Sequence, residues 1–204
     1  MFKVVALFFT VLLGMTGSAA LAAEARVDAN RVMGDPRAPV LVEEFASLTC
    51  GHCGRFANEV FPTFKARYID TGKARFVLRP VLTPPQNVAA AGFLLARCAG
   101  PEGYYPVIKG FFRRQEEMFR TGDARAALIA SAAEGGVTGP AVNACLADAA
   151  GQAALDAELE IGKTRGVEST PTFFFNGVKV KAGEMSIGEI DAAYEAALKA
   201  RRGR

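Results

Sequence analysis

Two cysteines separated by two residues, in the sequence Cys50-Gly51-His52-Cys53, are the residues of this chain best suited to do chemistry. Two thiols at this spacing can close a small disulfide ring across the first turn of a helix, which suits a disulfide that is made and broken repeatedly. The nucleophile in disulfide exchange is the thiolate, so one of the cysteines needs a lowered pKa. The unpaired N–H groups and the positive dipole end of a helix N-terminus supply that lowering. The pair therefore predicts dithiol–disulfide exchange at the start of a helix.

Two other uses of such a cysteine pair are a fixed structural disulfide and half of a zinc site. A structural zinc site needs four ligands, which usually come from two such pairs or from nearby histidines. This chain has one C-x-x-C pair and a single histidine, His52, which lies between the two cysteines. We therefore expect no metal site, and no cofactor other than the redox-active cysteine pair.

The residues around the pair predict the elements that position it. Val40 to Phe45 is typical of a short strand, residues 46–49 are typical of a loop, and apolar side chains recur at helical spacing from Arg55 to Tyr68. Pro62 lies inside this helix and is expected to kink it, because proline removes a helical donor. A second strand is expected at residues 74–82.

The middle of the chain, from Gln86 to about Arg165, predicts helices and no strand. These stretches are rich in alanine and are punctuated by glycine and proline. The expected helices are Asn87–Cys98, Tyr104–Arg120, Asp123–Gly135, Gly139–Ala150 and Gln152–Gly166.

The C-terminal part changes pattern again. Residues 171–175 predict a strand, Asn176-Gly177 a tight hairpin turn, and residues 178–181 the partner strand. A last helix is expected from Ser186, which can form a capping box with Glu189. The whole order predicts an α/β fold, in which a small mixed central sheet is flanked by helices and an all-helical subdomain is inserted between its two halves.

The N-terminus is predicted to be a cleaved signal peptide, residues 1–23. Lys3 supplies a positive start, residues 4–13 form an apolar run, and small residues with Ala-x-Ala-like sites follow. The run is shorter than the roughly twenty apolar residues of a membrane span, and an uncleaved anchor is the alternative interpretation. We expect an exported, periplasmic protein, in a compartment where disulfides persist.

The charge of the chain argues against one class of partner. The formal net charge is only +3, and the sole basic cluster is the terminal stretch 201–204. No lysines and arginines are interleaved with aromatic residues elsewhere, so nucleic-acid binding is not expected.

These motifs together resemble the DsbA-type thiol–disulfide oxidoreductases, which have a thioredoxin fold with a helical insertion. The resemblance covers Val40 to Leu198. Its most specific parts are Glu44-Phe45-x4-Cys50-Gly51-His52-Cys53 and the segment from Gly166 to Gly177, in which Thr170-Pro171 leads into a strand and hairpin. The resemblance implies a lead-in at 24–39, a first thioredoxin half at 40–84, a helical insertion at 85–165, a second half at 166–200 and a basic tail at 201–204.

The resemblance also implies roles for the residues of the C-x-x-C segment. Cys50 matches the exposed nucleophile of the family, and Cys53 matches the buried resolving thiol. An imidazolium or N–H donor at His52 would favour the Cys50 thiolate and stabilise the reduced state, which makes the disulfide a better oxidant. The Gly-His dipeptide is that of eukaryotic protein disulfide isomerase, whereas DsbA typically has Pro-His. The departure implies a competent oxidant rather than an extreme one.

Three residues outside this segment match positions with a role in the family. Glu44 matches a buried acid that exchanges a proton with the resolving thiol, and burial would raise its pKa. Glu43 is the competing assignment, because adjacent strand residues face opposite sides. Pro171 matches a cis-proline opposite the cysteines, where the Thr170 backbone would pair with an extended substrate peptide.

Cys98 and Cys145 remain, and both fall in the helical block. In an exported protein this even remainder favours a second, structural disulfide, and two separate buried thiols are the alternative.

The sequence therefore predicts an exported oxidase that donates the Cys50–Cys53 disulfide to unfolded or newly exported proteins. The resemblance implies that a membrane partner of the DsbB type would reoxidise it. The alternatives are an isomerase or reductase kept reduced by a membrane electron donor, and a client-specific redox chaperone or metallochaperone. About fifteen residues separate the signal peptide from the first strand, too few for a dimerisation domain, so we expect a monomer.

Overall fold

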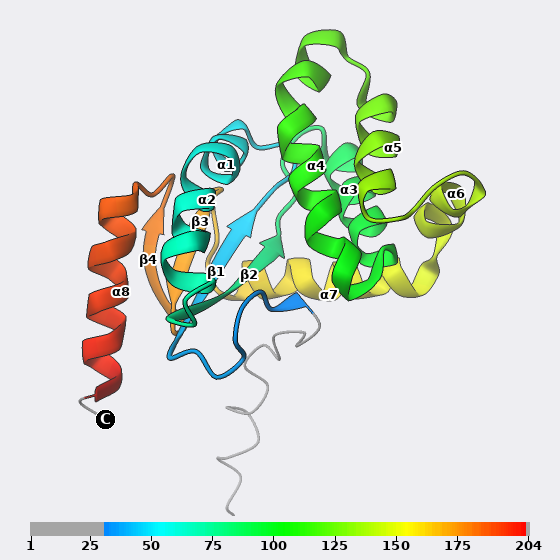
Figure 1. The fold of residues 1–204 in the computed structure, drawn as a ribbon. Coiled ribbons are helices and arrows are strands. Elements are labelled where there is room, and N and C mark those ends of the chain that lie inside the picture. The colour runs from blue at the N-terminus through cyan, green and yellow to red at the C-terminus, as the bar shows by residue number, and fades with distance from the viewer. Residues whose placement is uncertain (1–30, 203–204) are drawn as a thin grey trace, which may run out of the picture.

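One mixed sheet organises the computed structural model, which describes residues 31–202. Its strands are β1 (Val40–Ala46), β2 (Ala74–Pro80), β3 (Thr172–Phe175) and β4 (Val178–Ala182), in the order β2-β1-β3-β4 (Figure 1). β1 pairs in parallel with β2 and antiparallel with β3, and β3 pairs antiparallel with β4. The predicted signal peptide and the first part of the lead-in lie outside the described residues.

The turn between β3 and β4 is the tight hairpin turn predicted at Asn176-Gly177. Asn176 and Gly177 both have positive φ, 47° and 81°, as a two-residue hairpin turn matched to strand twist requires. β2 ends at Pro80, two residues earlier than expected, because its partner β1 ends at Ala46. The lead-in adds an unexpected contact at the other edge, where Met33 pairs with Phe76 of β2 through two backbone hydrogen bonds.

A helical segment crosses from β1 to β2, as a parallel pair requires. It consists of α1 (Gly51–Arg55), η3 (Phe56–Val60), α2 (Phe61–Phe64) and η4 (Lys65–Ile69). The helix begins at Gly51 with Cys50 as its N-cap, so the cysteine pair spans its first turn as predicted. Its hydrogen-bond ladder alternates between α and π, and Pro62 lies in the first turn of α2, directly after a π-helical stretch.

The predicted insertion between the two halves of the sheet is confirmed as five helices. They are α3 (Gln86–Cys98), α4 (Gly100–Thr121), α5 (Ala124–Glu134), α6 (Pro140–Ala147) and α7 (Ala149–Thr164). The boundary between the last two was predicted wrongly. The Asp148 side chain accepts hydrogen bonds from the N–H groups of Ala150 and Gly151, so it caps α7 and ends α6 three residues early.

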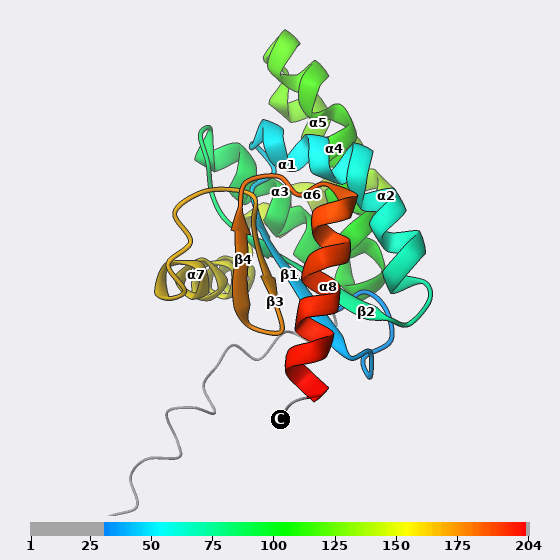
Figure 2. The ribbon, with the colours of Figure 1, turned by 90° about the vertical axis from the view of Figure 1, so that its left-hand side faces the viewer.

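The faces of the sheet are covered by different helices. α7 lies on one face, and the crossing segment lies with α8 (Ile187–Arg202) on the other (Figure 2). The Ser186–Glu189 capping box at the start of α8 is confirmed by reciprocal hydrogen bonds. α8 also corrects the prediction of a free basic tail from residue 201, since Arg201 and Arg202 form its last turn, where the negative end of the helix dipole favours cations.

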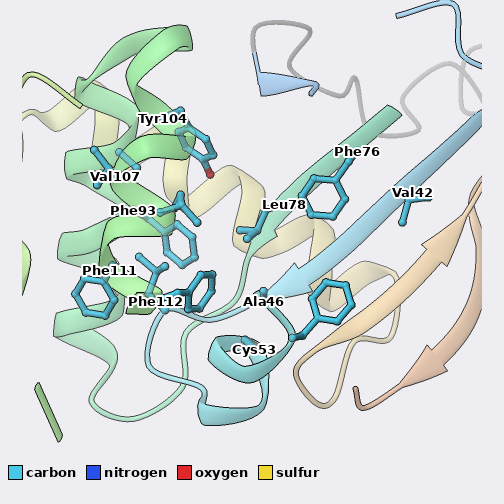
Figure 3. Packing of buried hydrophobic residues seen from close by; sticks show 14 of the residues in the cluster. Val42, Ala46, Cys53, Phe76, Leu78, Phe93, Tyr104, Val107, Phe111 and Phe112 are labelled. Carbon is cyan, nitrogen blue, oxygen red and sulfur yellow. The ribbon is translucent and has the colours of Figure 1, made fainter. Parts of the chain in front are cut away.

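A single hydrophobic core joins the sheet to the insertion. Figure 3 shows Phe93, Phe111 and Phe112 of α3 and α4 beside Leu78 of β2 and Cys53 of α1, and all five are buried. Cys98 of α3 and Cys145 of α6 form a disulfide with their Cα atoms 5.7 Å apart. Within residues 31–202, the helices are too short or too polar to cross a membrane.

Candidate active site

The loop between β1 and α1 is held in place by hydroxyl groups. The Ser47 side chain accepts hydrogen bonds from the backbone N–H and the hydroxyl of Thr83, and the Thr49 hydroxyl donates to the Thr83 carbonyl at 2.7 Å. Ser47 and Thr49 are both buried. The loop is thereby tied to the segment that follows β2, which fixes the position of the next residue, Cys50.

Cys50 is the N-cap residue of α1. Its Sγ accepts a hydrogen bond from the Cys53 N–H at 3.4 Å. The pKa of Cys50 is lowered to about 5, chiefly by hydrogen bonding with the Cys53 side chain and further by backbone N–H groups of the first turn, against an opposing effect of partial burial. The side-chain hydrogen bond and the N–H groups of the helix N-terminus both stabilise the anion, so Cys50 is the thiolate of the pair.

Cys53 faces the opposite way, into the core. Its side chain is fully buried, and both thiols are unbridged in this structure. Burial raises the pKa of Cys53, and hydrogen bonding with Cys50 and the charge of Glu44 add to the rise. The two cysteines of one motif are therefore an accessible thiolate and a protonated buried thiol.

Glu44 is the acid beneath the pair. It is buried, and burial raises its pKa to about 8, with a further contribution from the charge of Cys50. Its Oε1 atom has no hydrogen-bond partner among the described residues. Glu44 therefore holds a proton near neutral pH and can exchange it with Cys53.

Glu43, the competing assignment, has a different environment. Its carboxylate accepts hydrogen bonds from Arg79 at 2.6 Å and from Arg165 at 2.8 Å, and it is buried between them. A carboxylate held by two arginines is a structural ion pair, not a mobile proton carrier. This contrast favours Glu44 as the acid of the site.

Thr170 and Pro171 lie across from the cysteines. The Thr170–Pro171 peptide bond is cis, and the Cys50 Sγ lies 3.3 Å from the Thr170 carbonyl oxygen. The fold thus brings residues 120 positions apart to the thiolate. The Pro84–Pro85 bond, which follows Thr83, is also cis and was not predicted from the sequence.

His52 lies on the exposed side of α1 with two charged neighbours that the sequence did not reveal. Its Nδ1 lies 2.5 Å from Glu184 Oε1, and the Arg55 guanidinium donates to the same oxygen at 2.6 Å. Glu184 belongs to the loop between β4 and α8. The imidazole is therefore held by a carboxylate from the second half of the fold, and the contribution of His52 to the lowered pKa of Cys50 comes from its backbone N–H.

Gln115 of the insertion is hydrogen-bonded to the active-site loop. It is buried in α4, and its side-chain amide donates to the carbonyls of Leu48 and Cys50 at 2.6 and 3.1 Å. The close approach needs a glycine opposite, since a Cβ at Gly54 would lie 2.3 Å from Gln115 Oε1. The sequence does carry a signal, because Gln115 is a polar residue at a position of α4 whose periodicity is otherwise apolar.

The arrangement can carry out thiol–disulfide exchange with its own side chains. An accessible thiolate, a buried thiol that can close a ring with it, and a proton carrier beneath the buried thiol are in place. Among residues 31–202, no group of three or more His, Cys, Asp or Glu side chains is placed to hold a metal ion.

Comparisons with known proteins agree with this chemistry. Residues 26–195 match the family model described as thioredoxin. A Rickettsia bellii protein named a protein-disulfide oxidoreductase is 31% identical over 176 residues, which cover 85% of this chain and 66% of that protein. A Rickettsia conorii protein of the same name is 31% identical over 84% of this chain and 61% of its own length. The chain thus spans less than two thirds of these relatives.

Solved structures show the same fold. A crystal structure of a variant of Wolbachia pipientis alpha-DsbA1 has a TM-score of 0.71 and 27% identity, covering 84% of this chain and 94% of that one. Oxidised BdbD from Bacillus subtilis has a TM-score of 0.64 at 20% identity, covering 83% of this chain and 92% of that one, which shows the fold alone. The predicted thioredoxin fold with a helical insertion is confirmed.

Proposed function

The chain belongs to the thioredoxin family, as a DsbA-type oxidoreductase, and from this premise we propose that it oxidises pairs of cysteine thiols in exported proteins. The observation that carries the proposal is the opposite perturbation of its two thiols, with the pKa of Cys50 lowered to about 5 and that of Cys53 raised. A stabilised Cys50 thiolate stabilises the reduced protein, and a protein with a stabilised reduced form is a stronger oxidant.

In the first step a substrate thiolate attacks Cys50 Sγ of the Cys50–Cys53 disulfide. A bond forms between the substrate sulfur and Cys50, and the Cys50–Cys53 bond breaks. Cys53 leaves as a thiolate in a buried site, where a charge is costly. The proton on Glu44 neutralises it, since burial raises the pKa of this carboxyl to about 8 and so keeps it protonated at neutral pH.

In the second step another substrate thiolate attacks the substrate sulfur of the mixed disulfide. The substrate disulfide forms and Cys50 leaves as a thiolate. A thiol of low pKa is a good leaving group in exchange, and hydrogen bonds from the Cys53 side chain and from backbone N–H groups of the first turn give Cys50 that property. Two electrons pass from the substrate to the enzyme, which ends as a dithiol. In reverse, Cys53 gives its proton to Glu44 and resolves the mixed disulfide.

Substrate peptides are proposed to bind along the Thr170–Pro171 segment. The Thr170 carbonyl lies 3.3 Å from Cys50 Sγ, so a peptide paired with this backbone would present a cysteine to the nucleophile. Such pairing uses only the backbone of the substrate and does not depend on its side chains. Unfolded or newly exported proteins of many sequences could therefore serve as substrates.

The rest of the functional assignment follows from the same premise. We propose export to the periplasm by the signal peptide at residues 1–23, action as a monomer, and reoxidation by a membrane partner of the DsbB type. The runner-up is an isomerase or reductase that a membrane electron donor keeps in the dithiol form. A client-specific redox chaperone is the third candidate.

The test is the reduction potential of the Cys50–Cys53 pair, measured by equilibration in glutathione buffers. The Cys98→Ala/Cys145→Ala protein serves as the control, because it isolates the active pair. A potential more oxidising than the glutathione couple supports the oxidase. A strongly reducing potential would overturn it in favour of the isomerase or reductase.

A further inference from the structure

A cavity of about 450 Å³ lies between the helical segment that follows Cys53 and helix α4. Its walls are mainly aromatic and aliphatic, formed by Phe61, Phe76, Leu78, Ile108 and Phe112. Phe76, Leu78 and Phe112 are labelled in Figure 3, in which Phe112 lies near Cys53. The volume and the apolar walls are those of a site for a small organic molecule.

Glu44 is one of the residues that line this cavity. Its side chain is buried, and Oε1 has no hydrogen-bond partner among the described residues. A buried polar atom without a partner costs free energy that a suitable ligand would recover. Since burial raises the pKa of Glu44 to about 8, the carboxyl is protonated at neutral pH and donates. The complementary ligand group is a neutral oxygen acceptor such as a carbonyl.

The rest of the lining carries positive charge. Lys65 and Lys109 are its two cationic residues, and Glu44 is its sole acidic one. Lys65 is already paired with Asp70 at 2.5 Å. Lys109 is exposed on α4, and none of the ion pairs found among residues 31–202 includes it. The charge of the lining therefore fits a ligand with a single anionic group.

We propose that this cavity binds an amphipathic aryl carboxylate whose carbonyl oxygen accepts a hydrogen bond from Glu44 and whose carboxylate pairs with Lys109. The aromatic body lies against Phe61, Phe76 and Phe112. This inference rests in part on the proposed oxidase function, because a ligand that engages the Glu44 proton withholds it from the departing Cys53 thiolate. The bound molecule is an inhibitor of substrate oxidation that does not touch Cys50.

The binding test uses 6-acetyl-2-naphthoate as the probe, titrated into the purified oxidised protein at pH 6.5 by calorimetry. We expect one site with a Kd below about 1 mM, as suits a ligand of this size. Methyl NMR shifts at Leu78 and Ile108 locate it. Two analogues of the probe test its polar groups on the native protein: 2-naphthoate lacks the acetyl carbonyl, and 2-acetylnaphthalene lacks the carboxylate. Each is expected to bind about tenfold more weakly or worse.

Matched variants test the two ends of the cavity. Lys109→Glu is expected to weaken the probe at least about tenfold while leaving 2-acetylnaphthalene unaffected. Lys199→Glu makes the same charge change on α8, away from the cavity, and is expected to change neither. Ala57→Phe, which fills the cavity from η3, is expected to abolish binding. Binding that survives Ala57→Phe, or shifts confined to other residues, would overturn the assignment of the site.

The functional readout is the rate of mixed-disulfide formation with a thiol peptide. Saturating probe is expected to slow it about tenfold in the native protein and not in Ala57→Phe. A bound probe that leaves the rate unchanged overturns the inhibition. Binding is measured without substrate, so its absence overturns this inference and leaves the oxidase proposal standing. A reducing potential overturns the oxidase proposal and leaves the binding result standing.

Discussion

At the scale of single residues, Cys50 and Cys53 lie within one turn of helix but in opposite environments. Cys50 is half-buried at the N-cap, where N–H groups of the first turn face its sulfur, whereas Cys53 is sealed in the core. The pKa of Cys50 falls and that of Cys53 rises. This asymmetry gives exchange a direction, because substrates meet only the sulfur that is stable as an anion.

The first prediction concerns the Cys50 thiolate. Hydrogen bonding with the Cys53 side chain is the largest cause of its lowered pKa, so Cys53→Ala is expected to raise the pKa of Cys50 from about 5 toward the ordinary thiol value of about 8.5. Thiolate absorbance near 240 nm against pH measures it, with Cys50→Ala as the blank. An unchanged titration in Cys53→Ala would assign the lowering to the helix N-terminus alone.

The same pKa predicts how the reduced protein responds to acid. A group whose folded pKa is depressed stabilises the fold above its ordinary value, and that contribution is lost as pH falls through the folded pKa. The stability advantage from Cys50 is therefore present above about pH 8.5 and is lost toward pH 5. Urea unfolding of the reduced protein at several pH values should show this trend, and Cys50→Ala should lack it.

At the scale of elements, helix α4 connects the insertion to the active-site loop. Gln115 donates to the carbonyls of Leu48 and Cys50, so it fixes the backbone on both sides of Thr49. We assign it a positioning role, through the loop and not through substrate. A second amide offers a matched comparison, because Asn58 also joins the crossing segment to α4, through the Phe112 carbonyl at 3.1 Å.

The second prediction compares these two amides. Gln115→Leu is expected to lower the free energy of unfolding by about 1–3 kcal/mol, because it removes the side-chain donor of the buried Leu48 carbonyl. Asn58→Leu is expected to cost less, because Asn58 is exposed and the Phe112 carbonyl lies within helix α4. Only Gln115→Leu is expected to move the pKa of Cys50, since only Gln115 contacts the loop. Urea unfolding and the 240 nm titration measure the two effects. Equal pKa values in both variants would reduce Gln115 to a structural role.

The third prediction concerns the link between α3 and α6. Cys98 and Cys145 close a loop with a sequence separation of 47. The chain-entropy description gives such a crosslink about 4 kcal/mol of stabilisation, by constraining the unfolded chain. Cys98→Ala/Cys145→Ala is expected to lose about 2–4 kcal/mol in urea unfolding, with the Cys50 pKa unchanged. A shifted pKa would show that this disulfide also tunes the active site.

The sequence predicted the elements better than the contacts between them. Local patterns were enough for the Asn176-Gly177 turn, the Ser186 capping box and the number of helices in the insertion, because these depend on residues close in the chain. Gln115 and Glu184 were missed because their partners, Cys50 and His52, are distant in sequence. The end of α6 does not show in the local pattern, because Asp148 lies between alanines that suit a continuous helix and its side chain instead caps α7.

At the scale of the whole molecule, Glu43 joins three parts of the fold. It extends from β1, Arg79 from β2, and Arg165 from the point where the chain leaves α7 for the second half of the sheet. The Arg165 guanidinium also lies 3.9 Å from the centre of the Phe174 ring on β3. Glu44, the next residue, faces the other side of the sheet, and none of the ion pairs found among residues 31–202 includes it. Adjacent glutamates therefore serve stability and chemistry separately.

The fourth prediction tests this division with the same substitution at both positions. Glu43→Gln leaves two arginines without a buried counter-charge, so it is expected to lower the free energy of unfolding by about 3–5 kcal/mol, with the reduction potential unchanged. Urea unfolding at pH 7 measures the first effect, and equilibration in glutathione buffers measures the second. An equal loss of stability in Glu44→Gln would contradict the assignment of Glu43 as the structural residue.

Glu44→Gln is expected to slow the exchange reaction without lowering the free energy of unfolding. A carboxyl whose folded pKa is raised to about 8 stabilises the fold below its ordinary value, and this contribution is lost as pH rises toward 8. At pH 7 the variant is freed from a cost of up to about 3 kcal/mol, less the cost of burying the amide, so it should not be destabilised.

The rate at which Glu44→Gln forms the mixed disulfide should fall about tenfold. This loss is smaller than positioned acids usually contribute, because a thiolate is a weak base. Stopped-flow reaction with a thiol peptide measures that rate, and a rate equal to that of the native protein would show that Cys53 takes its proton from water.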